Sequence, residues 1–542
     1  MKPGNSIAAP IIFACIFVTA CSCTSFATEP TGGNAEKYKE IQAVLEAAIA
    51  NKEYESEYDD LMRSPYLRDV LVAIAAVDPA KGLSLFADLD NLYRGENKPG
   101  FRAMTASALA RALTGAERLK LFKACQESNA PEIGQSVALS ARVSSPEELT
   151  AIAALVDPRT AEGSLALLLA AADLKDSGGD WNKTLQMAQY RNEGREPLAI
   201  ANKAFRAYLE GDVDSFRKLL GETLSESKTE EQTMITTIGI SVPLKLMLMR
   251  AVRKTPDHRV RYADYVCEAS KSIKDGAAAF TVLAFVAESL GEKPSDCLAT
   301  QLKERWNDEY LDGAMSAGKH GAAFYAFNAM LGADEQWAIT VAEKLVASIM
   351  AQESPKNYYH MIGTIAGVVA SKDPNRARKI AKQAKMLEWY GNALRCVYRE
   401  WGKVNPKAAL LAVKEEDFWM DDESRHRMCA DVTLEAAVGS SLVDPLLAVD
   451  EIALLPDNQI RFTQGYCLVA PPLARKDLDR ALRLLMPAEG KPMIADAATA
   501  LAHIVLDHYG IDIDPTVTDF YPDYLRPRNL WPGPHLAQPI RF

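Results

Sequence analysis

The sequence lacks the short motifs that mark several common reaction centres. Its 542 residues contain no Cys-x-x-Cys, no HExxH, no P-loop, no GxSxG and no GxGxxG after a strand pattern. These absences argue against a thioredoxin-like redox protein, an HExxH zinc protease, a P-loop nucleotide hydrolase, an α/β-hydrolase and a dinucleotide-binding enzyme. We therefore expect no catalytic residue, no metal site and no cofactor, and an enzyme is the less favoured class.

Cysteine is sparse, and positive charge is outnumbered by negative charge. Beyond the N-terminal leader there are six cysteines, too few for a disulfide scaffold, and we expect them to pack as small apolar side chains, although an exported protein could oxidise a pair. Without the leader and its single Lys2, the chain has 61 − 1 = 60 basic and 72 acidic residues, a formal charge of −12. A nucleic-acid partner is not expected, because such binding needs a basic surface.

The one long apolar run lies at the N-terminus, from Ile7 to Ala20. Its layout is typical of an export signal, and two processing sites compete. Cleavage after Ala27 would release a soluble periplasmic or secreted chain. Val18-Thr19-Ala20-Cys21 resembles a bacterial lipobox, which implies a lipid on Cys21 and attachment to the outer membrane. In both cases the signal (1–27, or 1–20 with lipidated Cys21) is removed, and the mature chain has no transmembrane helix.

Helical periodicity covers most of the rest of the chain. Apolar residues recur at spacings of 0, 3, 4 and 7, as in Val70, Ala73, Ile74 and Val77. Capping residues followed by Pro divide this pattern into helices of ordinary length, since Pro suits the first turn of a helix. The sequence therefore predicts an all-α fold.

Four helix starts in the C-terminal half are regularly spaced. An Asp or Asn can cap the free N–H groups of a first turn, and the Pro that follows lacks an N–H of its own. The intervals of 32, 39 and 33 residues each fit one helix-turn-helix unit. The four starts are Asp373-Pro374, Asn405-Pro406, Asp444-Pro445 and Asp477.

These units resemble the tetratricopeptide-like class of helical-hairpin repeats. In the segment 401–406, Trp-Gly-Lys-Val-Asn-Pro, one helix closes and the next opens, as between repeats of that class. The resemblance implies an α-solenoid of antiparallel helix pairs, about 32–39 residues per repeat, with a concave surface for a protein or peptide. We expect N-terminal repeats over 28–175, an irregular helical connector over 176–254, C-terminal repeats over 255–508 and a tail over 509–542.

The tail combines prolines with aromatic residues. Six prolines rule out a helix there, while the aromatics make it too apolar for a free linker. We expect an extended segment that either caps its own solenoid or presents itself to another protein as Pro-rich ligands do. The aromatic residues are Phe520, Tyr521, Tyr524, Trp531 and Phe542.

Three features of the sequence are candidate sites of chemistry. Gln352-Glu353-Ser354 resembles the catalytic Glu-Ser of lytic transglycosylases, but the Gly-rich segment of that family does not follow. The acidic stretch 415–423 could attract Ca²⁺, but it lacks the spacing of a calcium loop and is better interpreted as a solvated loop. The histidines are expected singly, at the surface or at interfaces, because none has metal-ligand spacing.

The sequence favours an exported, non-catalytic scaffold or adaptor that binds polypeptide partners in the cell envelope. Two alternatives remain open at this point. One is a helical-toroid enzyme acting on envelope carbohydrate, and the other is a glycan- or peptide-binding lipoprotein without catalysis.

Overall fold

The structure is a computed structural model that describes most of the region between residues 32 and 511. Long described segments are 32–50, 60–93, 98–127, 146–156, 276–290, 294–307, 321–351, 359–384, 387–416, 422–456, 465–487 and 493–511, with short stretches between 158 and 219 and between 267 and 271. Every regular element in these segments is helical, so the all-α prediction is confirmed. The signal, Cys21, Glu353 and the tail aromatics lie outside the described residues.

The helices are named in chain order. The N-terminal group is α1 (Gly32–Ala50), α2 (Asp60–Val77), α3 (Pro79–Ala87), α4 (Leu89–Leu92), α5 (Lys98–Ala112), α6 (Gly115–Glu127), α8 (Pro146–Leu155) and α10 (Trp181–Met187). The C-terminal group is α15 (Gly276–Leu290), α16 (Asp296–Arg305), α18 (Gly321–Met330), α19 (Glu335–Met350), α20 (Tyr359–Ala370), α21 (Pro374–Ala381), α22 (Leu387–Val404), α23 (Pro406–Lys414), α24 (Asp422–Ser441), α25 (Pro445–Ala453), α26 (Cys467–Ala474), α27 (Leu478–Leu485) and α28 (Ala495–His508).

The four predicted helix starts are confirmed as N-caps. A side-chain oxygen of Asp373, Asn405, Asp444 or Asp477 accepts a hydrogen bond from the backbone N–H three residues later, at 2.9 to 3.3 Å. Pro occupies the first turn in α21, α23 and α25, and is absent from α27. The cap alone is therefore sufficient to begin α27.

Replacing Asp444 with Ala will destabilise the protein by about 1 kcal/mol, because the N–H of Leu447 loses its acceptor. Asp444→Asn keeps an oxygen in the same place and is expected to change stability by only a few tenths of a kcal/mol. Urea unfolding followed by circular dichroism measures both. Equal losses for the two variants would show that the side-chain cap does not stabilise α25.

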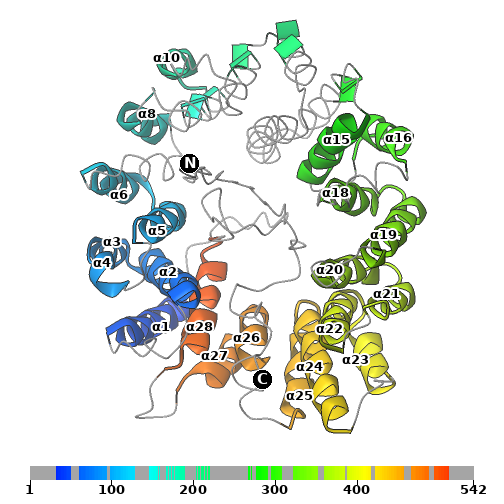
Figure 1. The fold of residues 1–542 in the computed structure, drawn as a ribbon. Helices are drawn as coiled ribbons and strands as arrows, with labels where there is room; N and C mark the ends of the chain where they lie inside the picture. Colours follow the sequence, from blue (N-terminus) through cyan, green and yellow to red (C-terminus); the bar gives the residue numbers. More distant parts are fainter. Residues whose placement is uncertain are drawn as a thin grey trace, which may run out of the picture.

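The helices form two layers around a common centre (Figure 1). Helices α20, α22, α24 and α26 lie nearer the centre, and α21, α23, α25 and α27 lie outside them. Consecutive inner helices contact one another, from α20 through α22, α24 and α26 to α28. Helices α1 and α2 in turn pack against α28, so helices from the two ends of the chain lie side by side. One continuous apolar cluster runs from Tyr38 to Leu506.

Glycines allow the inner helices to approach closely. A Cβ added at Gly363 would lie 3.3 Å from the Cα of Ala393, and one added at Gly402 would lie 2.5 Å from the carbonyl oxygen of Ala436. Space for a side chain is therefore missing on both sides of α22. This packing fixes the register of α20, α22 and α24.

Candidate functional site

Charged side chains gather where α22 packs on α24. Basic groups recur every fourth residue along one face of α22, and acidic groups four residues apart face them from α24. We call this group the charged seam, and it consists of Arg395, Arg399, Glu400, Lys403, Asp431 and Glu435.

The seam is held by three ion pairs, two between the helices and one within α22. Arg395 pairs with Asp431 across the two helices, and Arg399 Nη1 lies 3.2 Å from Glu435 Oε2. Lys403 pairs with Glu400 one turn back on α22. Arg399, Glu400 and Asp431 are all buried. Three positive and three negative charges therefore balance inside the helix packing.

Burial governs the protonation of the seam. Removal from water raises the pKa of Glu400, although the charges of Lys403 and Arg399 oppose this rise. Burial likewise lowers the pKa of Lys403, against the opposing charge of Glu400. A ligand that drew one of these groups away would leave a buried charge without its counter-ion, which is costly. The seam is therefore suited to holding the helices in register.

A second buried cluster surrounds Glu416, the second residue of the acidic stretch 415–423. Glu416 Oε2 accepts hydrogen bonds from Arg378 Nε at 2.7 Å and from Tyr398 Oη at 2.5 Å, and Lys382 Nζ lies 3.3 Å from Oε1. Burial raises the pKa of Glu416, but these bonds outweigh it and hold the pKa below its usual value. The solvated-loop interpretation is therefore wrong for Glu416, because a cation on the preceding outer helix draws this acid inward.

A third polar group joins α2 to α28. The buried carboxylate of Asp69 accepts a hydrogen bond from Arg68 Nε at 2.7 Å, and His503 Nε2 lies 2.9 Å from its other oxygen. Nearby, the ring of His508 stacks on Tyr38 with centroids 4.0 Å apart. Both histidines thus lie at an interface, in line with the sequence-based expectation. We call this contact the closing junction.

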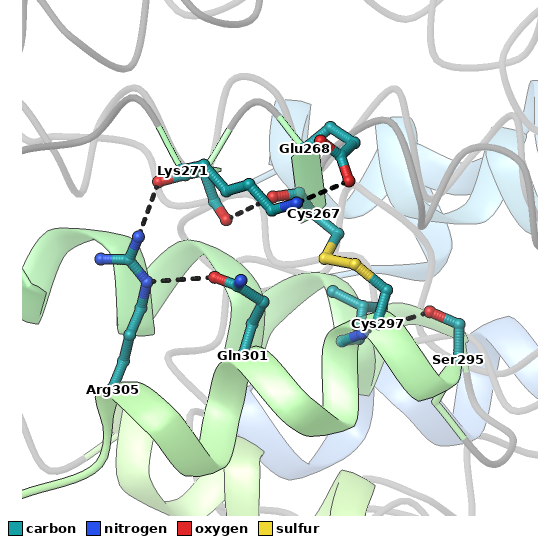
Figure 2. The surroundings of a disulfide bond; sticks show 9 residues. Cys267, Glu268, Lys271, Ser295, Cys297, Gln301 and Arg305 are labelled. Atoms are coloured by element: carbon teal, nitrogen blue, oxygen red, sulfur yellow. Dashed lines mark hydrogen bonds and ion pairs between the residues drawn. A yellow bond between two sulfur atoms is a disulfide. The ribbon is translucent and has the colours of Figure 1, made fainter.

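A disulfide joins Cys267 to Cys297, with Cα atoms 6.4 Å apart (Figure 2). Arg305 connects the same two segments a second time, because its Nη2 donates a hydrogen bond to the carbonyl oxygen of Ser270 at 3.1 Å. Cys125 and Cys467 are buried thiols, as expected for small apolar side chains. The disulfide pair had no sequence pattern to mark it, since the two cysteines are 30 residues apart.

Among the described residues, no group of His, Cys, Asp and Glu side chains is arranged to hold a metal ion. Helices long and apolar enough to cross a bilayer are likewise missing from that part of the chain. The sequence-predicted residues Cys21, Phe520, Tyr521, Tyr524, Trp531 and Phe542 fall outside it, so their roles stay predictions. No protein-family model, curated protein or solved structure matches the sequence.

Proposed function

We propose that the protein is an exported, non-catalytic α-solenoid of antiparallel helix pairs, similar to tetratricopeptide-like repeats, which binds polypeptide partners in the cell envelope. The alternation of inner and outer helices from α20 to α28 supports this proposal. A curved inner layer offers a long surface made from many equivalent helices, which suits an extended polypeptide.

The observation that carries the proposal is the spacing of ion pairs between helices. Cross-helix ion pairs recur between residues that are 31 to 38 positions apart, close to the interval between capped helix starts. Each pair thus links one unit to the next, as nearest-neighbour contacts do in repeat proteins. Examples are Lys303–Asp334, Arg376–Glu343, Arg378–Glu416, Arg395–Asp431, Lys414–Glu451 and Arg475–Asp507.

The Cys267–Cys297 disulfide supports export, because disulfides persist in oxidising compartments. A lipid on Cys21 would hold the mature protein at the outer membrane, and cleavage after Ala27 would leave it soluble. Mass spectrometry of the mature N-terminus distinguishes these two forms. A chain that retains Met1 when isolated from the native cell would contradict export.

Reduction of the disulfide is expected to lower the free energy of unfolding by about 3 to 4 kcal/mol, because closing a loop of 30 residues restricts the unfolded chain. Urea unfolding with and without reductant measures the loss. The Cys267→Ser/Cys297→Ser variant is the control, and reductant should not shift its midpoint further. Two free thiols at these positions in the oxidised native protein would contradict the expectation.

Crosslinking from defined positions tests the scaffold. A photo-reactive residue is placed at Val368 or Leu468, which are half-buried on the inner helices α20 and α26, and as matched controls at Lys407 or Lys414 on the outer helix α23. In envelope fractions we expect polypeptide adducts from the inner positions above the level of the controls. Absence of any polypeptide adduct from the inner positions would count against the proposal.

The contact of α1 and α2 with α28 favours a second candidate, a helical-toroid enzyme acting on envelope carbohydrate. In that case Glu353 would supply the acid. Incubation of the protein with purified cell-wall glycan should then release soluble fragments, and Glu353→Gln should abolish the release. Retention on the glycan without fragments would instead favour the glycan-binding lipoprotein.

A further inference from the structure

Large apolar side chains are exposed at two successive turns of the inner layer. Val404 is the last residue of α22 and is 59% exposed, while Leu442 and Val443 follow α24 and are 58% and 50% exposed. Leu446, in the first turn of α25, adds a fourth at 41%. We call these four residues the edge patch.

The register of α22 and α24 brings the two turns to the same level. A Cβ at Gly402 would lie 2.9 Å from the backbone nitrogen of Ser440, so these two residues are neighbours. Val404 and Leu442 each come two residues later, at the C-terminal ends of α22 and α24. The exposed residues of the two units therefore lie on one edge of the molecule, at the C-terminal ends of the inner helices.

A hydrogen bond and an ion pair connect this edge to the end of α28. Lys476, which follows α26, donates from Nζ to the carbonyl oxygen of Val443 at 3.1 Å. Arg475 pairs with Asp507 near the end of α28, at 2.6 and 2.7 Å. The chain thus leaves α28, at Ile511, on the same edge as the patch and two inner helices away from it.

The order of residue types after Ile511 matches the order of features along this edge, with acidic residues first and aromatic residues next. Three aspartates come first, at 512, 514 and 519, and they would pass the exposed basic side chains of Arg475 and Lys476. The aromatic residues begin at Phe520 and Tyr521. Neighbouring helices lie roughly 10 Å apart, so the patch is roughly 20 Å from Ile511. Nine residues in extended form reach about 30 Å, which brings Phe520 to the patch.

We propose that residues 512–542 run along this edge of their own chain and cover the edge patch with their first aromatic residues. Proline-rich chain is suited to such a position, because it holds an extended form without internal hydrogen bonds. The docked tail would remove the four exposed aliphatic side chains from water. This inference does not depend on the identity of any partner of the inner surface.

Trypsin cleavage after Arg528 tests the proposal on the full chain, since the bond after Arg526 precedes Pro527 and resists cleavage. A Leu442→Ser/Val443→Ser variant is expected to be cut on the order of tenfold faster than the unchanged protein, because cleavage follows the undocked population. Leu454→Ser is the matched control, since Leu454 is 73% exposed at the opposite end of α25. Equal cleavage rates for all three proteins would overturn the proposal.

A second measurement avoids substitution in the folded helices. Deletion of residues 512–542 should raise amide hydrogen exchange at 442–446 and leave the exchange of α25 beyond Ala448 unchanged. Unchanged exchange at the patch would overturn the docking. If protection of Arg528 from trypsin rises with protein concentration, the patch binds a second copy of the chain. If this protection requires phospholipid vesicles, the patch binds a membrane. Both results exclude docking within one chain.

Discussion

Gly439→Ala will lower the free energy of unfolding by about 3 kcal/mol or more. The added Cβ would lie 1.9 Å from the carbonyl oxygen of Arg399 and 2.8 Å from its carbonyl carbon. Both atoms belong to the backbone of α22, so the clash is relieved only when the helix itself moves. Such overpacking costs typically 1 to 3 kcal/mol and occasionally more, and here it also displaces the buried Arg399 of the charged seam.

Two other glycines provide graded controls for urea unfolding. A Cβ at Gly391 would meet the terminal Cε of Met428 at 2.2 Å, and this flexible side chain can rotate away. A Cβ at Gly332 has no atom within 4 Å. We expect a small loss for Gly391→Ala and almost none for Gly332→Ala. If Gly439→Ala were as stable as Gly332→Ala, the close packing of α22 on α24 would be refuted.

Asp69→Ala is expected to destabilise the closing junction by about 3 to 5 kcal/mol. The substitution removes the acceptor shared by Arg68 and His503 and leaves Arg68 buried with one fewer counter-charge. Asp479→Ala is the control, because its pair with Lys37, which joins the neighbouring helices α27 and α1, is exposed and should contribute little. Urea unfolding measures stability, and small-angle scattering reports whether α1 and α2 leave α28.

The same carboxylate predicts a direction for the pH dependence of the junction. Burial raises the pKa of Asp69, but the charge of Arg68 and the bond to His503 outweigh it, so the folded pKa lies below the usual value. A lowered folded pKa means that Asp69 stabilises the fold above about pH 4 and loses this contribution as pH falls further. Between neutral pH and pH 2, the stability difference between the unchanged protein and Asp69→Ala should therefore shrink. A difference that stays constant would contradict the assignment.

Local features of the fold were predictable from the sequence, and long-range ones were not. The caps at Asp373, Asn405, Asp444 and Asp477 depend on atoms three residues away, so a short window of sequence contains their cause. Asp69 and His503 are 434 residues apart, and no periodicity links them.

In the candidate site, too, the local spacing of residues was predictable from the sequence and their contacts between helices were not. The basic residues of α22 recur at helical spacing, but their pairing with Asp431 and Glu435 depends on the register that the glycines set between two helices. Glu416 was misassigned for a related reason. A run of acids is normally solvated, and only the neighbouring Arg378 and Lys382 reverse that preference for one of them.

The contact of α2 with α28 also has a kinetic consequence. During synthesis α2 emerges early, and the helix that covers its buried face emerges several hundred residues later. Contacts between such distant segments form slowly, and incomplete chains expose apolar surface. A chain that stops before α28 would keep the face of α2 that contains Asp69 uncovered. Proteases can attack such a product. The packing of α28 on α2 therefore protects a chain that contains α28 and leaves a chain truncated before it unprotected.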